Sequence, residues 1–123
     1  TVSNTCSFQN FTNENATGTD NAPTPGCAGY TGGDVWFKVL VPAEGAINFN
    51  TEAAVMTDGG MAIYSGSCDN LNLLLCDDNT GTGNMPQIIA SALTPGDTIW
   101  VRVWENGNNN NGSNCFNKYN IFR

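Results

Sequence analysis

Short apolar segments recur about every 10–15 residues along this chain, and turn-forming residues separate them. The clearest is segment 98–104, in which aliphatic side chains alternate strictly with Trp, Arg and Trp. Such alternation is typical of a half-buried β-strand, because successive side chains of a strand point to opposite faces. Helices are not expected, since Asn, Thr, Gly and β-branched residues dominate the composition. The pattern predicts an all-β fold, an antiparallel β-sandwich.

The 123 residues suffice for one domain but not for two ordinary ones. The predicted strands are residues 7–12, 35–41, 46–51, 61–65, 71–76, 87–93, 98–104 and 115–122. We therefore expect a single domain over residues 1–123. Within it, residues 1–33 supply a first strand and a long surface crossing, and residues 34–123 form the sandwich core.

The charge balance excludes several classes of partner. Four Lys and Arg against eleven Asp and Glu give a formal charge of −7. Four scattered cations cannot follow a phosphate backbone, so nucleic acid is not an expected partner, and no apolar run is long enough for a membrane span. Histidine is absent, which removes Ser–His and Cys–His catalysis and the usual zinc ligands. An enzyme is disfavoured, because a glycosidase carboxylate pair would need a deep cleft, which such polar loops do not favour.

Five cysteines in a chain poor in Lys and rich in Asn and Thr predict a secreted or cell-surface protein. The chain begins without Met or an apolar leader, so we expect that a signal peptide has been removed or that this is a piece of a longer protein. No C-x-x-C pair occurs, which argues against zinc-ribbon and thioredoxin-like motifs. Cys68 and Cys76 flank a short predicted hairpin, and Cys6 and Cys27 bracket the N-terminal crossing. We predict the disulfides Cys6–Cys27 and Cys68–Cys76, with Cys115 left over or bonded outside this chain.

Three tryptophans are predicted on outer faces of the strands. In segment 98–104 the aliphatic side chains face inward, which places Trp100, Arg102 and Trp104 together on the outer face. The same alternation places Trp36 on an outer face. Exposed aromatic rings with a polar neighbour suit stacking on sugar rings, so these four residues are the candidate ligand-binding set. The alternative is that a loop or a neighbouring strand covers the rings, as happens to most tryptophans.

Four carboxylates are predicted at one end of the sandwich. If the strands from residue 61 onward form a meander, then Asp58, Asp77, Asp78 and Glu105 converge there. Clustered carboxylates repel unless a cation neutralises them, and Ca²⁺ accepts the carboxylate and carbonyl oxygens that Gly- and Asn-rich loops offer. The alternative is that each acid stabilises its own turn in water. A calcium site and a set of solvated turns both remain open.

Several motifs occur together in one order along the chain. They are GDVWFKV at 33–39, VPAEG at 41–45, TDGGMAIYSGSC at 57–68, LCDD at 75–78, LTPG at 93–96 and VRVWE at 101–105. Over most of the chain, from about residue 6 to about residue 112, this set resembles the bacterial pre-peptidase C-terminal domain family, in the form common in secreted proteins of the Bacteroidetes. The resemblance implies a non-catalytic, jelly-roll-like β-sandwich attached to secreted peptidases, glycoside hydrolases or adhesins. Relatives include modules treated as carbohydrate-binding and collagen-binding domains that carry calcium, partly on an acidic segment where this chain has Glu14 and Asp20.

These features favour a non-catalytic secreted module that binds a surface polymer, a glycan first of all, beside an enzyme or in an adhesin. The alternative is a structural subunit or spacer of an extracellular assembly or filament, stabilised by calcium and joined to other copies or domains. Exposed aromatic side chains would favour the first function. Aromatic side chains buried against a neighbouring copy would favour the second.

Overall fold

The computed structural model describes residues 9–12, 22–27, 29–30, 33–53, 58–67, 70–79, 83–107 and 113–120, and leaves the side chains of 9–12, 52–53 and 113–120 undescribed. These residues form strands, turns and loops with no helix, and hence no helix that could cross a membrane. The strands are β1 (Gln9–Thr12), β2 (Val35–Leu40), β3 (Ile47–Ala53), β4 (Gly59–Ser67), β5 (Asn70–Asp77), β6 (Gln87–Ala90), β7 (Thr98–Glu105) and β8 (Ser113–Asn120). The all-β prediction is confirmed.

Each of the predicted strands is present, with ends that differ by a few residues. The largest difference is in β6, which ends at Ala90 instead of residue 93. Ala92 adopts a positive φ of 57°, a left-handed conformation that takes the backbone out of the extended region. The strand therefore ends before its apolar pattern does.

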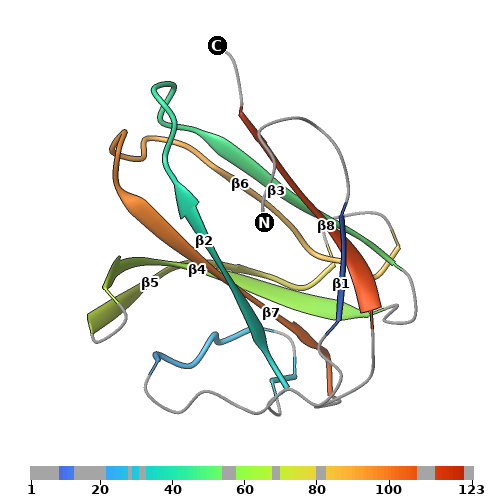
Figure 1. The fold of residues 1–123 in the computed structure, drawn as a ribbon. Helices are drawn as coiled ribbons and strands as arrows, with labels where there is room; N and C mark the ends of the chain where they lie inside the picture. Colours follow the sequence, from blue (N-terminus) through green and yellow to red (C-terminus); the bar gives the residue numbers. More distant parts are fainter. Residues whose placement is uncertain are drawn as a thin grey trace.

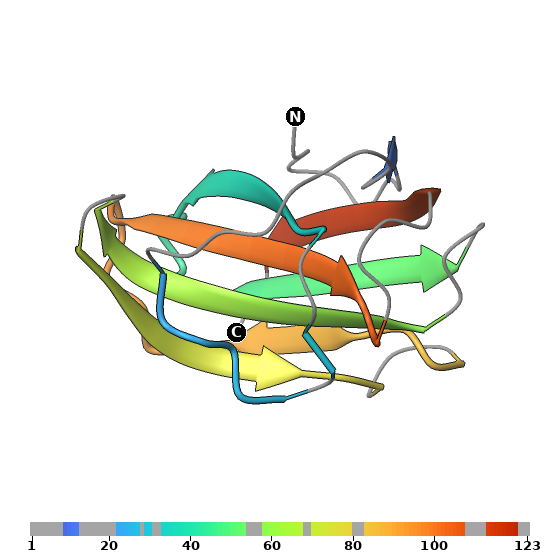
Figure 2. The ribbon, with the colours of Figure 1, turned by 90° about the horizontal axis from the view of Figure 1, so that it is seen from below.

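The strands form two antiparallel sheets, ordered β1-β8-β3-β6 and β2-β7-β4-β5, which lie face to face (Figures 1 and 2). Antiparallel pairs join β1 to β8, β2 to β7, β3 to β6 and β4 to β5. The meander predicted from residue 61 onward is wrong, because the chain changes sheets between β5 and β6. Of that group, β4, β5 and β7 lie in one sheet and β6 and β8 lie in the other.

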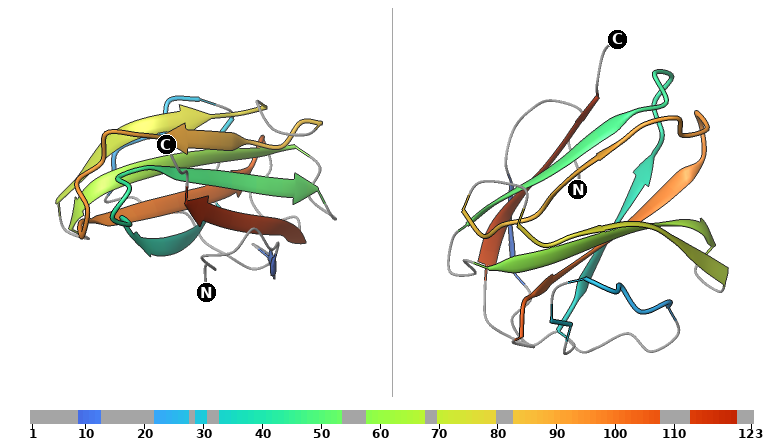
Figure 3. Two further views of the ribbon diagram at one scale, coloured as in Figure 1. Left: turned by 90° about the horizontal axis from the view of Figure 1, so that it is seen from above. Right: turned by 180° about the vertical axis from the view of Figure 1, so that it is seen from behind.

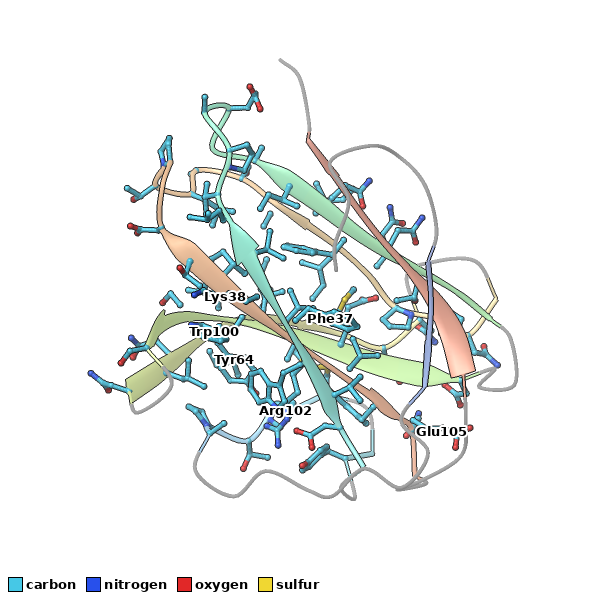
Figure 4. All side chains as sticks on the ribbon, in the orientation of Figure 1. Phe37, Lys38, Tyr64, Trp100, Arg102 and Glu105 are labelled. Atoms are coloured by element: carbon cyan, nitrogen blue, oxygen red, sulfur yellow. A yellow bond between two sulfur atoms is a disulfide. The ribbon has the colours of Figure 1, made fainter. Side chains whose placement is uncertain are left out.

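The core lies between the sheets and is almost entirely aliphatic. The inward side chains of β7 and of β2 belong to it, as their alternation predicts, and Phe37 packs against it (Figure 4). The buried members are Val39, Val41, Ile47, Phe49, Met61, Ile63, Ile88, Ala90, Ile99, Val101 and Val103.

A second buried cluster lies on the opposite, outer face of the sheet β2-β7-β4-β5. Residues 22–27, with Gly29 and Tyr30, run across this face and are called the covering segment (blue in Figures 1 and 3). A disulfide between Cys27 and Cys76 ties the segment to β5, with the two Cα atoms 5.9 Å apart. Two residues after Cys27, the Gly29 N–H donates to Asn106 Oδ1 at 2.6 Å. The segment therefore closes part of the outer face.

The predicted disulfides Cys6–Cys27 and Cys68–Cys76 are both wrong, because Cys27 and Cys76 are bonded to each other. Cys76 pairs with Ala62 toward one end of the β4–β5 ladder, whereas Ser67 pairs with Asn70 at the other end, next to Cys68 in the sequence. The N-terminal crossing thus passes over the sheet instead of closing on itself. Cys6 and Cys68, and the side chain of Cys115, lie outside the described part of the chain.

Candidate functional site

Arg102 lies at the centre of the outer-face cluster (Figure 4). Its side chain is 1% exposed, and its Nε–H donates to Asp34 Oδ2 at 2.6 Å, where the Asp34 side chain is fully buried. Its Nη1 donates to the Tyr64 hydroxyl at 3.1 Å and to the Pro23 carbonyl at 3.4 Å. A buried charge needs a close counter-ion and hydrogen-bond partners, and Arg102 has both.

The protonation states of this cluster follow from burial and from the ion pair. Desolvation raises the pKa of Tyr64 against the lowering effect of Arg102, so its neutral hydroxyl donates to the Pro23 carbonyl at 2.7 Å. For Arg102, desolvation opposes the charged form, but hydrogen bonds to Tyr64 and Asp34 outweigh it and raise the pKa. The guanidinium therefore stays charged inside the cluster.

Aromatic rings enclose the guanidinium. Its Cζ lies 4.2 Å from the Tyr30 ring centroid and 5.2 Å from that of Trp36, both within range of a cation–π contact. Trp104 is fully buried and meets Tyr30 edge-on, with ring centroids 5.6 Å apart. A Cβ on Gly60 would collide with the Trp104 indole, so glycine is required beneath this ring.

The predicted stacking surface is wrong for two of its four residues. Trp104 and Arg102 are 0% and 1% exposed, because the covering segment closes the face that holds them. Trp36 is half-buried, its indole N–H donates to Asp34 Oδ2 at 3.0 Å, and its ring lies 5.3 Å from that of Tyr64. The alternative interpretation, that a loop covers the rings, therefore applies to the centre of this face.

Trp100 lies at the border of the cluster (Figure 4) and, like Trp36, is partly buried. Its indole N–H donates to the Gly66 carbonyl at 2.9 Å, which fixes the orientation of the ring. The exposed Lys38 is its register partner on β2, with Nζ 5.7 Å from the ring centroid. Leu40 follows on the same face of β2 and is 64% exposed. Of the four predicted ligand residues, Trp36 and Trp100 stay partly exposed, and Trp100 is the one whose ring lies beside an exposed cation, that of Lys38.

Three of the predicted metal ligands lie near one another where β4 begins and β5 ends. Burial raises the pKa of Asp78, and the nearby charges of Asp58 and Asp77 raise it further. Asp77 Oδ2 also accepts the N–H of Gln87 at 2.9 Å, which links the two sheets. Within the described residues no three His, Cys, Asp or Glu side chains are arranged to hold a metal ion. The calcium site therefore stays a prediction.

Glu105, the fourth predicted metal ligand, does not lie in a loop. It is the last residue of β7. It pairs with Gly59 in the register of β7 and β4, and its side chain is 7% exposed. Two residues from Val103 on β7, it shares that residue's inward face. The alternation of inward and outward side chains predicted for residues 98–104 therefore continues to Glu105.

Replacing Asp78 with Asn should stabilise the metal-free protein at pH 7 by less than about 1 kcal/mol, since Asp78 is partly exposed and solvent screens its neighbours. A carboxyl whose folded pKa is raised contributes stability below its unfolded pKa of 3.8 and loses it as pH rises. The gain should therefore vanish near pH 3. Urea unfolding in the presence of chelator, at pH 7 and at pH 3, measures this change in the free energy of unfolding. Replacement of the exposed Asp97 with Asn is the control.

If calcium binds to Asp58, Asp77 and Asp78, then in the presence of calcium Asp78→Asn should make the protein less stable than the wild type. At 100 times its dissociation constant, calcium should stabilise the wild-type protein by ~2.7 kcal/mol. Asp78→Asn should then lose this stabilisation, so that calcium no longer raises its melting temperature. Identical melting of the wild-type protein with calcium and with chelator would leave the acids as solvated turn residues.

No protein-family model, no curated protein and no solved structure matches this chain. The resemblance to pre-peptidase C-terminal domains accordingly stays a prediction from the motifs. What the chain does must be argued from the residues that its two sheets leave accessible.

Proposed function

We propose that this chain is a non-catalytic, secreted or cell-surface module that binds an extracellular polymer, with a glycan as the ligand. The Cys27–Cys76 bond supports an oxidising compartment, where disulfides persist. The absence of histidine and the structural use of Arg102 and Asp34 support a binding role over catalysis. An attached enzyme or adhesin would supply the context in which such a module acts.

The strand order supports the jelly-roll-like sandwich that the motif resemblance implies. The first strand pairs with the last, β2 with β7, β3 with β6, and β4 with β5, all antiparallel. A long two-stranded hairpin wound into two sheets has this order, and wound sandwiches of this kind recur in lectins and other binding proteins. The fold alone does not select a ligand.

The observation that carries the glycan proposal is the state of Trp100. Its ring is partly exposed, is held by one hydrogen bond to the Gly66 carbonyl and is flanked by the exposed cation of Lys38. A fixed aromatic ring beside a hydrogen-bond donor suits a sugar, whose apolar ring face stacks while its hydroxyls take hydrogen bonds. One such ring favours a weak, open subsite on a polymer over a closed pocket.

Trp100→Ala should weaken polysaccharide binding about fivefold, which corresponds to ~1 kcal/mol for one stacked ring. Calorimetric titration with a soluble β-glucan, a xylan and a polygalacturonate would measure it. Ile89→Ala is the matched control, because Ile89 is 58% exposed but belongs to the other sheet. Unchanged affinity of a folded Trp100→Ala protein, or no binding of any of the three polymers, would contradict the proposal.

A structural subunit of an extracellular assembly is the second candidate. The observation that favours it is the row of exposed leucines on β5, an edge strand. Exposed apolar side chains at a sheet edge are typical of surfaces that meet another chain. In this role, copies of the chain would have to form dimers or larger assemblies in solution.

A further inference from the structure

We propose that the edge formed by β5 and β6 is a strand-addition site for a partner protein. Its occupant is an extended segment with alternating apolar side chains and a Lys or Arg at the end that lies nearest Asp77. Main-chain hydrogen bonds to β5 would hold the segment, and its apolar side chains would enter the gap between the two sheets. The proposal concerns a different surface from Trp100 and does not rest on glycan binding.

The two edge strands lie on the same side of the molecule. β5 ends one sheet and β6 ends the other, and they run side by side (yellow and light orange in Figures 2 and 3). They meet where the Gln87 N–H donates to Asp77 Oδ2 at 2.9 Å. This side of the sandwich therefore presents a strand edge from each sheet.

β5 lacks most of the features that protect an edge strand from pairing. Natural edge strands are short or carry charged residues or proline. The edge strand β6 has four residues, and β2, which forms the other edge of the sheet that contains β5, carries the exposed Lys38. β5 has eight residues, NLNLLLCD, with no charge before Asp77 and no proline. Its one irregularity is a register shift opposite Ile63 and Tyr64 of β4.

The side chains along this edge are apolar and accessible. Leu73, Leu74 and Leu75 are 38%, 40% and 45% exposed, and Ile89 on β6 is 58% exposed. An open groove of about 180 Å³ lies between the strands, lined by Leu75, Cys76, Asp77, Gln87, Ile88 and Ile89. This volume is below the ~300–1,000 Å³ of small-molecule sites, so the groove suits the side chains of an added strand.

Charge defines the occupant further. Asp77 lines one end of the groove, and Asp58 and Asp78 lie near it, so that end is strongly acidic. At the other end the described residues, Asn70 and the one after it, are uncharged, and the sequence has a single acid there, Asp69. A cation on the occupant would therefore be favoured more at the end with three carboxylates, and in a strand antiparallel to β5 this is the N-terminal end. A second copy of β5 does not meet this requirement, because β5 carries no Lys or Arg.

The test is an NMR titration of the ¹⁵N-labelled chain with the capped peptide Lys-Val-Thr-Val-Thr-Val. We expect shifts in the amides of β5 and β6, and about fivefold weaker binding when the lysine is moved to the other end or replaced by norleucine. Leu75→Lys and Ile89→Lys, one on each wall, should each weaken binding at least about tenfold. Leu40→Lys is the matched control, an exposed leucine on the opposite edge of the sheet, and should bind as the wild-type chain does.

Thermal melting of each variant establishes that it is folded before its affinity is compared. Absence of shifts at millimolar peptide would overturn the proposal, as would equal weakening by Leu40→Lys. A concentration-dependent dimer in sedimentation that Leu75→Lys abolishes would assign the edge to a second copy and also overturn it. A glycan titration should leave the amide signals of β5 unshifted. Peptide binding at this edge can therefore be tested separately from glycan binding at Trp100.

Discussion

Replacing Asp34 with Ala should lower the free energy of unfolding by about 3–5 kcal/mol, because the change leaves the guanidinium of Arg102 buried without its counter-ion. The Asp34 side chain is fully buried, and the carboxylate oxygen that Arg102 contacts at 2.6 Å also accepts the indole N–H of Trp36. In a domain of this size the loss corresponds to a melting temperature lower by roughly 10–25 °C. Chemical unfolding monitored by tryptophan fluorescence measures it directly.

Two controls separate the ion pair from simple loss of packing. In Asp34→Ala with Arg102→Met no uncompensated charge remains, so the double variant should recover a large part of the lost stability. Lys38→Met removes an exposed cation from the same face and should change the free energy of unfolding by less than about 0.5 kcal/mol. A loss below about 1 kcal/mol in Asp34→Ala would show that the pair does not hold the cluster together.

Removing the Cys27–Cys76 disulfide should cost about 4 kcal/mol. The bond closes a loop between residues 49 positions apart, and in the chain-entropy model a loop of this length restricts the unfolded chain by about that amount. Cys27→Ala with Cys76→Ala would also release the covering segment from β5, so the aromatic cluster should become accessible. Unfolding curves and acrylamide quenching of tryptophan fluorescence measure the two effects.

The control for the disulfide keeps that bond and replaces the other three cysteines. A variant with Ala at Cys6, Cys68 and Cys115 should retain the wild-type stability to within about 1 kcal/mol. Peptide mapping without reductant should recover a linked pair that contains Cys27 and Cys76. Recovery of Cys68 linked to Cys76, or unchanged stability after loss of Cys27 and Cys76, would contradict the structure's assignment.

The strands and their faces could be predicted because a strand leaves a local signal in the sequence. Segment 98–104 alternates over its whole length, and the alternation correctly assigns Val101 to the core and Trp104 to the outer face. Turn residues such as Pro42 and Gly45 end the segments where the backbone turns. Each of these signals acts over two to four residues, so no information about distant parts of the chain is needed.

The contacts between distant segments could not be predicted in the same way. Residues 22–30 have no alternating pattern, so nothing local indicates that they lie on the outer face and bury Trp104 and Arg102. The pairing of Cys27 with Cys76 depends on that placement, and both predicted disulfides failed with it. Asp34, which binds Arg102, carries one signal that could have been used, because an acid two residues before Trp36 shares its face of the strand.

The most direct test of the proposed function follows the three tryptophan indole N–H signals of the ¹⁵N-labelled chain during titration with a soluble polysaccharide. Trp104 is fully buried in the cluster, whereas Trp36 and Trp100 are partly exposed and Trp100 lies beside the exposed Lys38. We expect a saturable shift of the Trp100 signal, with that of the buried Trp104 unchanged. A shift at Trp104, or saturable glycan binding that leaves Trp100 unmoved, would contradict the proposed function.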